Sequence, residues 1–379
     1  MRLEPSVPAE VLAAVRGAFA EMRATPIDPP LTLPLGLILD LSGESMRERL
    51  FMVQADAEEA LRPDFTIPAA RLHLESGKAA GRYLYEGKAF RAAVRGRESY
   101  EEFLQIGLEA FEPGATPEAD AEIAGLAWRA AAAGGRTDLT LQLGDVALFG
   151  AFVDTLKLAE PLAARLKRAF ATPRRLRELL DRAAAETPTA TPARASDGRI
   201  AALLAGLPEA DAAAALEDLW RLAGIAPAGG RSAAEIVHRL AERAAVARAP
   251  DLTREQAAQI GRFLAIEGAP AEALAAVGRL AGVGGPKLDA ALKAWSRRLS
   301  ALQGEGVPAT ALRFATAFGR DFGYYDGALF EVRSDALGPE RPVAAGGRYD
   351  SLFARLGASL PSGAVGCMVR PARAWREAL

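Results

Sequence analysis

Hydrophobic and polar positions follow two kinds of pattern along the chain. Short apolar runs and stretches with a period of two, which favour strands, alternate with a few helical stretches before residue 160 and again after residue 307. Between Glu160 and Gly306 the apolar positions recur at helical spacing throughout. This distribution predicts a sheet domain in two parts, 1–159 and 307–379, interrupted by a helical insertion over 160–306.

The first part of the sheet domain begins with an amphipathic stretch, which predicts a helix over 7–22. The apolar run 31–41 alternates poorly and predicts a strand buried on both faces, and 49–54 predicts another strand. After a proline-rich corner we expect a helix from near Ile67, with Thr66 placed to cap it.

Two strands, 81–91 and 102–111, are expected to pair antiparallel across a charged loop. One face of the second strand is aliphatic, and the other carries a mixed set: Phe103, Gln105, Gly107, Glu109 and Phe111. Two polar side chains separated by a glycine predict a hollow with a polar wall on each side. The alternative is a solvated sheet face, which would leave two phenylalanines in water.

Further elements follow from the same patterns. We expect helices over 116–133 and 145–158, and strands over 138–143 and 364–369. Within the helical insertion, the arginine runs Arg174–Arg177 and Arg297–Arg298 are expected on solvated helix faces, with nucleic-acid contacts as the alternative.

The stretch 314–357 has the most unusual pattern. Alternation over 324–331 predicts an extended segment with two different faces. Gly346-Gly347 predicts a tight turn, and the polar triplet Arg348–Asp350 follows directly before an expected helix. Taken alone, this arrangement also fits an ordinary loop.

Composition limits the classes of function. Half of the residues are hydrophobic and a quarter are charged, as in a globular protein. The 46 basic and 48 acidic side chains give a formal net charge of -2, whereas a surface that holds nucleic acid usually shows a basic excess. We therefore expect no nucleic-acid partner.

The sequence gives little support for a metal site or for a membrane-spanning segment. One cysteine, Cys367, and two histidines, His73 and His238, provide too few side chains for a disulfide, a Cys-rich zinc site or a His-based catalytic site. Cys367 is expected to be a buried small hydrophobe. Because no signal pattern and no apolar run of about 18 residues is present, we expect a cytoplasmic protein without a membrane partner. Because so few cysteine and histidine side chains are present, we expect no metal, and we expect no cofactor.

Two blocks near the end of the chain resemble the two signature blocks of histidyl-tRNA synthetases. They are Y-Y-D-G at 324–327 and A-G-G-R-Y-D-S-L at 345–352, in the same order and spacing. Residues 60–71 and 85–111 are similar to two further blocks of that family. The resemblance implies an α+β fold: a class II aminoacyl-tRNA synthetase-like antiparallel sheet core flanked by helices, with an inserted helical domain.

The resemblance also implies a histidine pocket. Asp64, Thr66 and Gln105 would hold the α-amino group, although Asp64 stands where the family has the longer glutamate. Arg320 would meet the carboxylate. A free amino acid needs an acceptor for its ammonium group and a cation for its carboxylate, so these residue types suit the task.

The other side of that pocket would face the histidine side chain. The resemblance places Glu109 and Tyr325 at the imidazole, with Tyr324 and Tyr349 lining the same pocket. A carboxylate and a phenol can bind the two ring nitrogens, because imidazole is mostly neutral at pH 7.

The nucleotide-binding residues depart from the synthetase pattern. Arg91 and Arg373 keep the positions of the two arginines that contact ATP, so we expect a vestigial nucleotide site. However, Ala92-Ala93 follow Arg91 where the family has an aromatic and an acidic residue. Arg370 replaces a glycine, and Ala372 replaces an acid. Six residues follow Arg373 and even a small domain takes about 50, so we expect no anticodon-binding domain.

The sequence keeps the residues of the histidine pocket but has lost residues of the ATP site. In this combination it resembles the family of ATP phosphoribosyltransferase regulatory subunits. That resemblance implies a non-catalytic protein of histidine biosynthesis that binds L-histidine, pairs with itself through the core, and joins a short-form catalytic subunit in a hetero-octamer. The resemblance also implies that the protein confers histidine feedback on the catalytic subunit and has no catalytic residues of its own. Two alternatives stay open: an enzyme that still makes histidyl-adenylate, and a tRNA-binding module.

Overall fold

The computed structural model describes residues 2–54, 57–93, 100–114, 116–184, 203–204, 206–223, 232–234, 236–238, 252–282, 284–319, 322–358 and 363–377. The chain forms two compact units. Unit 1 consists of Met1–Thr155 and Arg262–Leu379, and unit 2 consists of Leu156–Gly261.

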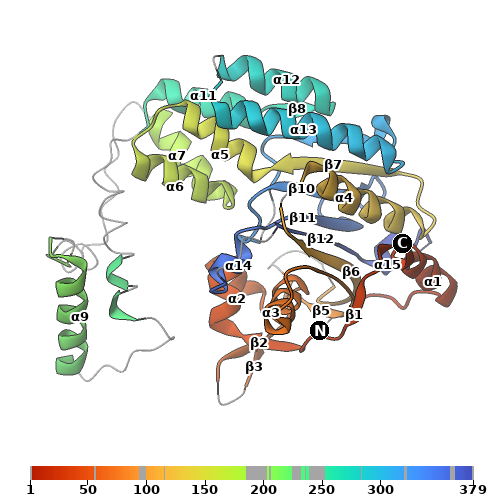
Figure 1. Ribbon diagram of the computed structural model, residues 1–379, viewed down its shortest axis with the longest axis horizontal. Coiled ribbons are helices and arrows are strands. Elements are labelled where there is room, and N and C mark those ends of the chain that lie inside the picture. The colour runs from red at the N-terminus through yellow and green to blue at the C-terminus, as the bar shows by residue number, and fades with distance from the viewer. Residues whose placement is uncertain are drawn as a thin grey trace. The chain divides into compact units, whose positions relative to one another are not determined.

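Within the described part of unit 1, nine strands form one sheet, and its centre is antiparallel (Figure 1). In spatial order the strands are β1 (Thr25–Ile27), β5 (Gly81–Phe90), β6 (Glu102–Glu112), β12 (Gly363–Val369), β11 (Ala344–Arg348), β10 (Ala328–Ser334), β7 (Leu139–Asp145), β9 (Leu312–Ala315) and β8 (Glu267–Gly268). Only β1–β5 and β7–β9 pair in parallel. The expected antiparallel pair of residues 81–91 and 102–111 is confirmed as β5 and β6.

Helices flank this sheet. Those assigned to unit 1 are α1 (Ala9–Gly17), α2 (Leu35–Ser42), α3 (Thr66–Ser76), α4 (Pro117–Ala132), α5 (Val146–Thr155), α12 (Pro270–Ala281), α13 (Pro286–Gly304), α14 (Leu352–Arg355) and α15 (Pro371–Ala374). Helix α4 packs on β11 and β12 and against α13 (Figure 1). Its start is fixed by the sequence, because the Thr116 side chain accepts a hydrogen bond from the Ala119 amide at 3.2 Å and Pro117 suits the first turn.

A charged network joins α4 to the sheet and to α13. The two oxygens of the Asp120 carboxylate accept from Arg348 Nε and Arg298 Nε, each at 2.6 Å. The expectation of a solvated face is therefore wrong for Arg298, whose side chain is 12% exposed. It holds for the neighbouring Arg297, which is 61% exposed and pairs with Glu118 at 2.7 Å.

The apolar run 31–41 differs from the predicted strand. It contains the short β2 (Thr32–Pro34) and then the buried helix α2. A short apolar run bounded by turn residues fits a buried strand and a buried helix equally, so its pattern could not decide. Strands β2, β4 (Glu59–Leu61) and β3 (Met52–Val53) form a second sheet of three strands, counted over the described residues.

Gly346-Gly347 does not form the predicted turn, because both residues lie inside strand β11. A Cβ at Gly346 would overlap the carbonyl oxygen of Gly366 and the ring of Phe330. The glycine is therefore explained by close packing within the sheet. The helix expected after the polar triplet is present as the short α14.

Unit 2 is helical in its described residues: α6 (Glu160–Phe170), α7 (Pro173–Ala184), α9 (Glu209–Ala223) and the first turns of α11 (Arg254–Leu264). The insertion was predicted to extend to residue 306. Because α12, α13 and β8 group with unit 1, unit 2 ends at Gly261 instead. As predicted, Arg174 is solvated: its side chain is 90% exposed.

Among the helices that the structure describes, none combines the length and apolar character needed to cross a membrane.

Candidate functional site

The carboxyl group of Glu109, in the middle of β6, lies at the centre of a cluster of hydroxyl groups. It is 1% exposed. Oε1 accepts from the Thr66 hydroxyl at 2.9 Å and from the Tyr85 hydroxyl at 3.4 Å, and Oε2 accepts from the Tyr349 hydroxyl. The carboxyl group of Glu109 in β6 is therefore contacted by side chains from β5, from the start of α3 and from just after β11.

Two glycines make room for this cluster. Gly366 pairs with Glu109 across the β6–β12 ladder, and a Cβ there would overlap Glu109 Oε2. Gly107 lies opposite Tyr85 in the β5–β6 ladder. The hollow predicted at Gly107 is filled by the Tyr85 phenol, which a Cβ at that position would overlap. The alternative of a solvated sheet face is wrong, because Phe103 on that face is also buried.

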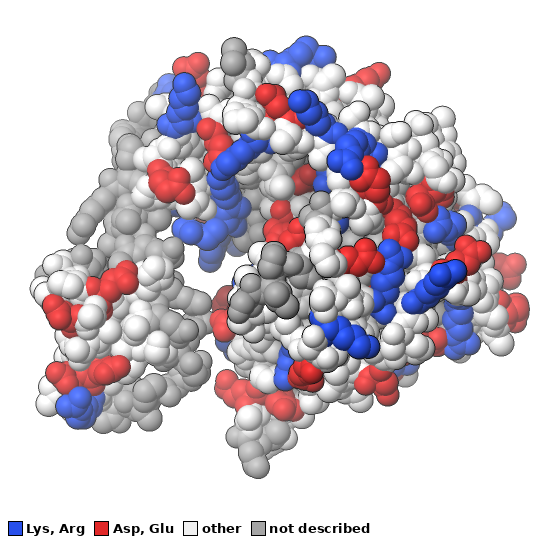
Figure 2. Space-filling model, in the orientation of Figure 1, with Lys and Arg blue, Asp and Glu red and all other residues white. Residues whose placement is uncertain are grey.

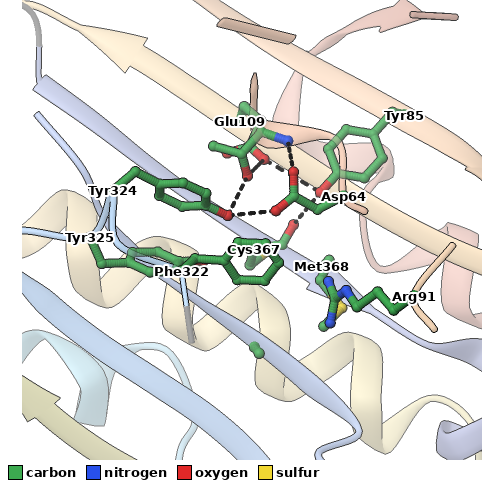
Figure 3. A pocket seen from close by; sticks show the side chains of 12 residues that line it. Asp64, Tyr85, Arg91, Glu109, Phe322, Tyr324, Tyr325, Cys367 and Met368 are labelled. Carbon is green, nitrogen blue, oxygen red and sulfur yellow. Dashed lines mark hydrogen bonds between the residues drawn. The ribbon is translucent and has the colours of Figure 1, made fainter. Parts of the chain in front are cut away.

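A second carboxylate, Asp64, stands beside the first. Its Oδ2 accepts from the Tyr324 hydroxyl at 2.7 Å, and its Oδ1 accepts from the Thr66 amide at 3.2 Å. Thr66 was expected to cap α3, but it is the first residue of that helix and its hydroxyl donates to Glu109 instead. Figure 3 shows the Tyr324 hydroxyl directed at Asp64, with Glu109 close by.

These groups line a cavity of about 290 Å³. The lining comprises Asp64, Thr66, Tyr85, Arg91, Glu109, Phe322, Tyr324, Tyr325, Ala345, Gly366, Cys367 and Met368 (Figure 3). The pocket thus has an acidic and phenolic wall and an apolar wall.

Burial controls the protonation of the pocket. It raises the pKa of Glu109 to about 8, and the nearby Asp64 charge acts in the same direction, while the hydroxyl donors oppose the shift. Burial also raises the pKa of Tyr324 and Tyr349 well above its usual value, so both phenols keep their protons. At neutral pH Glu109 is therefore mostly protonated.

The structure brings most of the predicted residues together. Asp64, Thr66, Glu109, Tyr324 and Tyr325 line the cavity, and Tyr349 contacts Glu109 from behind it.

Other predicted residues stand apart. Gln105 is fully buried but does not line the cavity, and neither polar atom of its side chain has a hydrogen-bond partner among the described residues. Arg320 lies outside the described residues.

The two nucleotide-site arginines do not share one pocket. Arg91 lines the cavity, donates from Nε to the Pro63 carbonyl at 2.8 Å, and lies 4.8 Å from the ring centre of Phe322. Arg373 lines a different pocket and donates to the Pro342 carbonyl at 2.9 Å.

Tyr85 and Gly366 were missed by sequence reasoning. The signal for Tyr85 was its place opposite Gly107 in a predicted hairpin, but using it required the exact strand register. Cys367 is buried as predicted. No group of three or more potential metal ligands occurs among the residues that the structure describes.

The pocket can bind a small cationic or hydrogen-bonding ligand. Asp64 supplies a fixed acceptor, and Glu109 can act as a hydrogen-bond donor or, after losing its proton, as an anion. Over the face of unit 1 drawn in Figure 2, basic and acidic side chains are intermingled, in line with the balanced net charge.

Comparisons with known proteins identify the family of the fold. The sequence model of the histidyl-tRNA synthetase family matches residues 10–243 and 217–371. A solved "ATP phosphoribosyltransferase regulatory subunit/histidyl-tRNA synthetase" from Bacillus halodurans superposes with a TM-score of 0.62 at 18% identity, covering 96% of this chain and 77% of that one. A histidyl-tRNA synthetase from Nostoc sp. PCC 7120 gives 0.60 at 15% identity, covering 97% and 72%. The fold is that of the class II, histidyl-tRNA synthetase-like proteins.

Curated relatives narrow this class. Proteins named ATP phosphoribosyltransferase regulatory subunit are 36% identical in Allorhizobium ampelinum, over 92% of both chains, and 35% identical in Agrobacterium fabrum, over 92% of this chain and 91% of that one. The chain belongs to the family of ATP phosphoribosyltransferase regulatory subunits.

Proposed function

We propose that this regulatory subunit binds L-histidine in the pocket around Glu109 and transmits that binding to a short-form ATP phosphoribosyltransferase catalytic subunit. The observation that carries the proposal is the buried Glu109 carboxyl group beside Asp64, both opening on a cavity of about 290 Å³. The chain itself contributes no catalytic residue in this proposal.

Each part of histidine has a matching group in the proposed complex. The ammonium group pairs with Asp64, which is already held by Tyr324 and by the Thr66 amide. The imidazole faces Glu109 and Tyr325. Arg320, assigned by the synthetase resemblance, meets the carboxylate. Gln105 stays in the proposal as a further partner of the ammonium group, and its unpaired amide would gain a partner if it reaches the ligand.

The proton on Glu109 explains why histidine suits this pocket. A buried carboxyl group with a pKa of about 8 holds a proton at neutral pH, and imidazole, with an ordinary pKa of about 6.5, can accept it. Because imidazolium is the stronger acid of the two isolated groups, proton transfer requires that the attraction within the buried imidazolium–carboxylate pair outweighs this difference. An amino acid with an aliphatic side chain cannot accept that proton.

Feedback requires coupling between two sites. Histidine must bind one quaternary state of the complex better than another, and the same coupling then changes the activity of the catalytic subunit. We propose a hetero-octamer with four copies of each subunit, which follows from the family resemblance.

The test compares Glu109→Gln with Glu75→Gln, an exposed glutamate on α3. Glutamine keeps the shape of the protonated acid but cannot become an anion. Losing a hydrogen bond to a charged group costs about 1.5–3 kcal/mol. Histidine affinity, measured by isothermal titration calorimetry on the isolated chain, should fall about 10- to 150-fold for Glu109→Gln and stay unchanged for Glu75→Gln.

The reconstituted complex provides the second half of the test. For Glu109→Gln, the histidine concentration that gives half inhibition should rise by the same factor as the dissociation constant. Equal inhibition of the variant and wild-type complexes would rule out this pocket as the feedback site.

A further inference from the structure

A second pocket, separate from the one around Glu109, lies between the N-terminal segment and α15. It has a volume of about 330 Å³. Its lining residues are Glu4, Pro5, Tyr100, Leu337, Arg341, Ala372 and Arg373. None of them lines the first pocket. Nothing in the proposed histidine site uses it.

Basic side chains outnumber acidic ones at this pocket. Arg373 lines the pocket and is 14% exposed. Arg370 lies behind the lining and is 5% exposed, and both arginines face the carboxylate of Glu4, which is 5% exposed. Arg370 donates to Glu4 Oε1 at 2.6 Å, while Arg373 Nε lies 3.9 Å from the same oxygen. Arg341 adds a further cation to the lining. One carboxylate therefore faces two buried guanidinium groups.

The electrostatics confirm the imbalance. Burial lowers the pKa of Arg373 well below its usual value, and the neighbouring Arg370, Arg91 and Arg341 charges lower it further, while Glu4 opposes the shift. Burial also lowers the pKa of Arg370, again opposed by Glu4. Glu4 is thus the carboxylate that stabilises both charged guanidinium groups.

The contact between Glu4 and the arginines leaves hydrogen-bonding capacity unused. Glu4 Oε2 and Arg370 Nε are both buried and have no hydrogen-bond partner among the described residues. A single carboxylate oxygen cannot satisfy two guanidinium groups, which offer five donors each. A phosphate group brings more charge and more acceptor oxygens, and arginine pairs with it in a bidentate geometry.

The segment that carries Glu4 has few attachments to the sheet. Leu3 pairs with Glu102 as an isolated bridge, the Glu4 amide donates to the Glu102 carbonyl at 3.1 Å, and the Glu101 amide donates to the Arg2 carbonyl at 2.9 Å. Leu3 itself is 59% exposed. A terminal segment held by a few backbone hydrogen bonds opens at low free-energy cost.

We propose that Arg370 and Arg373 form a binding site for a small phosphate-bearing anion, and that Glu4 is a tethered competitor for this site. In the closed form the N-terminal segment places the Glu4 carboxylate on the arginines. In the open form the segment leaves, and phosphate oxygens take its place between the same guanidinium groups and Arg341.

A tethered competitor lowers apparent affinity by the fraction of molecules that are open. Minor states of such equilibria are commonly populated at about 0.1–10%, and the proposal takes an open population of about 1–10%. Removing the Glu4 charge should therefore raise the affinity for a phosphate-bearing anion by about 10- to 100-fold.

The experiment measures binding of inorganic pyrophosphate to the full-length chain by isothermal titration calorimetry. Glu4→Gln should bind it about 10- to 100-fold more tightly than wild type. Glu10→Gln, an exposed glutamate on α1, is the matched control for a change of one charge and should bind like wild type. Adding Arg373→Met to Glu4→Gln should remove the gain.

Hydrogen exchange on the unmodified chain tests the opening directly. Saturating pyrophosphate should speed exchange at the amides of Glu4 and Glu101, which the closed form protects. Equal affinities for Glu4→Gln and Glu10→Gln, or a gain that survives Arg373→Met, would overturn the proposal. If Glu4→Gln does not fold, unchanged exchange at these two amides in wild type overturns it equally. Histidine binding is measured separately and does not decide this question.

Discussion

At the scale of single residues, Glu109 connects the sequence, the pocket and the proposed regulation. Its carboxyl group is buried because β6 has buried side chains on both faces, and it is accommodated because Gly366 lacks a side chain. A buried carboxyl group is expensive to ionise, and the three hydroxyl donors offset only part of this cost. The result is a group whose protonation changes close to neutral pH.

The raised pKa of Glu109 predicts how stability depends on pH. The folded-state pKa is about 8 and the ordinary value is 4.5, so the folded chain holds one more proton than the unfolded chain between these values. The stability contributed by this proton is complete below pH 4.5 and is lost as pH rises toward 8. Glu109→Gln has no such dependence.

The unfolding free energies of wild type and Glu109→Gln should therefore depend differently on pH. The unfolding free energy of wild type should fall relative to that of Glu109→Gln by about 1.4 kcal/mol for each pH unit between about pH 5 and 7.5. Urea unfolding at several pH values in that range gives the slope. A difference that is independent of pH would mean that Glu109 is ionised in the folded chain.

At the scale of elements, the contact of α4 with α13 and β11 depends on one shared carboxylate. Asp120 binds Arg298 from α13 and Arg348 from β11, and all three side chains are largely buried. Removing one partner of a buried ion pair leaves a charge that is only partly compensated, which costs far more than the loss of a surface pair.

Adjacent arginines allow a matched comparison. Arg298→Met should reduce the unfolding free energy by about 3 kcal/mol, because Asp120 loses a buried partner. Arg297→Met, one residue away on the exposed face of α13, should cost less than about 1 kcal/mol. Denaturant unfolding of both variants measures the difference, and equal losses would show that the Asp120 network adds no stability.

This network also shows what the sequence could and could not reveal. The β5–β6 hairpin, α4 and β12 followed from local periodicity and capping residues. The burial of Arg298 depends on Asp120, which lies 178 residues earlier, and no local pattern records such a partner. For the same reason Gly346-Gly347 looked like a turn, since only the neighbouring strands reveal the close packing that requires glycine.

The residues of the candidate site were predicted by a different route from the elements around them. The resemblance to synthetase blocks carried residue roles across the whole chain, so Asp64, Glu109 and Tyr324 were selected without knowledge of their distances. Tyr85 was missed although it lies in the block 85–111, because its contact with Glu109 depends on the cross-strand register, which places it opposite Gly107. The separation of Arg91 from Arg373 depends on the place of the N-terminal segment, which local patterns do not encode.

At the scale of the whole molecule, the departures around Arg91 and Arg370 bear on catalysis. Arg370 replaces a glycine of the synthetase pattern, and its guanidinium group lies 3.8 Å from the ring centre of Phe103, paired with Glu4. A bulky cation there obstructs the close approach of a nucleotide. We predict no histidine-dependent exchange of pyrophosphate into ATP by the purified chain, and measurable exchange would contradict this.

Assembly is the second prediction at this scale. Leu31, just before β2, and Met52, in β3, are each about half exposed. The resemblance to class II synthetases implies that the core dimerises through the region near 29–41, which contains Leu31. We expect a homodimer of the isolated chain, and co-purification with the catalytic subunit when both are expressed. Light scattering and a tagged pull-down measure the two, and a stable monomer that captures no catalytic subunit would count against both.

The pocket is assembled from distant parts of the chain, which has a consequence for synthesis of the protein. Glu109 is bonded to Tyr349, 240 residues later, and Asp64 to Tyr324, 260 residues later. During synthesis the chain therefore carries the carboxyl groups of Asp64 and Glu109 without their phenol partners until Tyr324 and Tyr349 have left the ribosome. Contacts of such long sequence separation form late and slowly. Under the proposal that histidine binds the assembled pocket, the ligand would favour completed chains over partly folded ones.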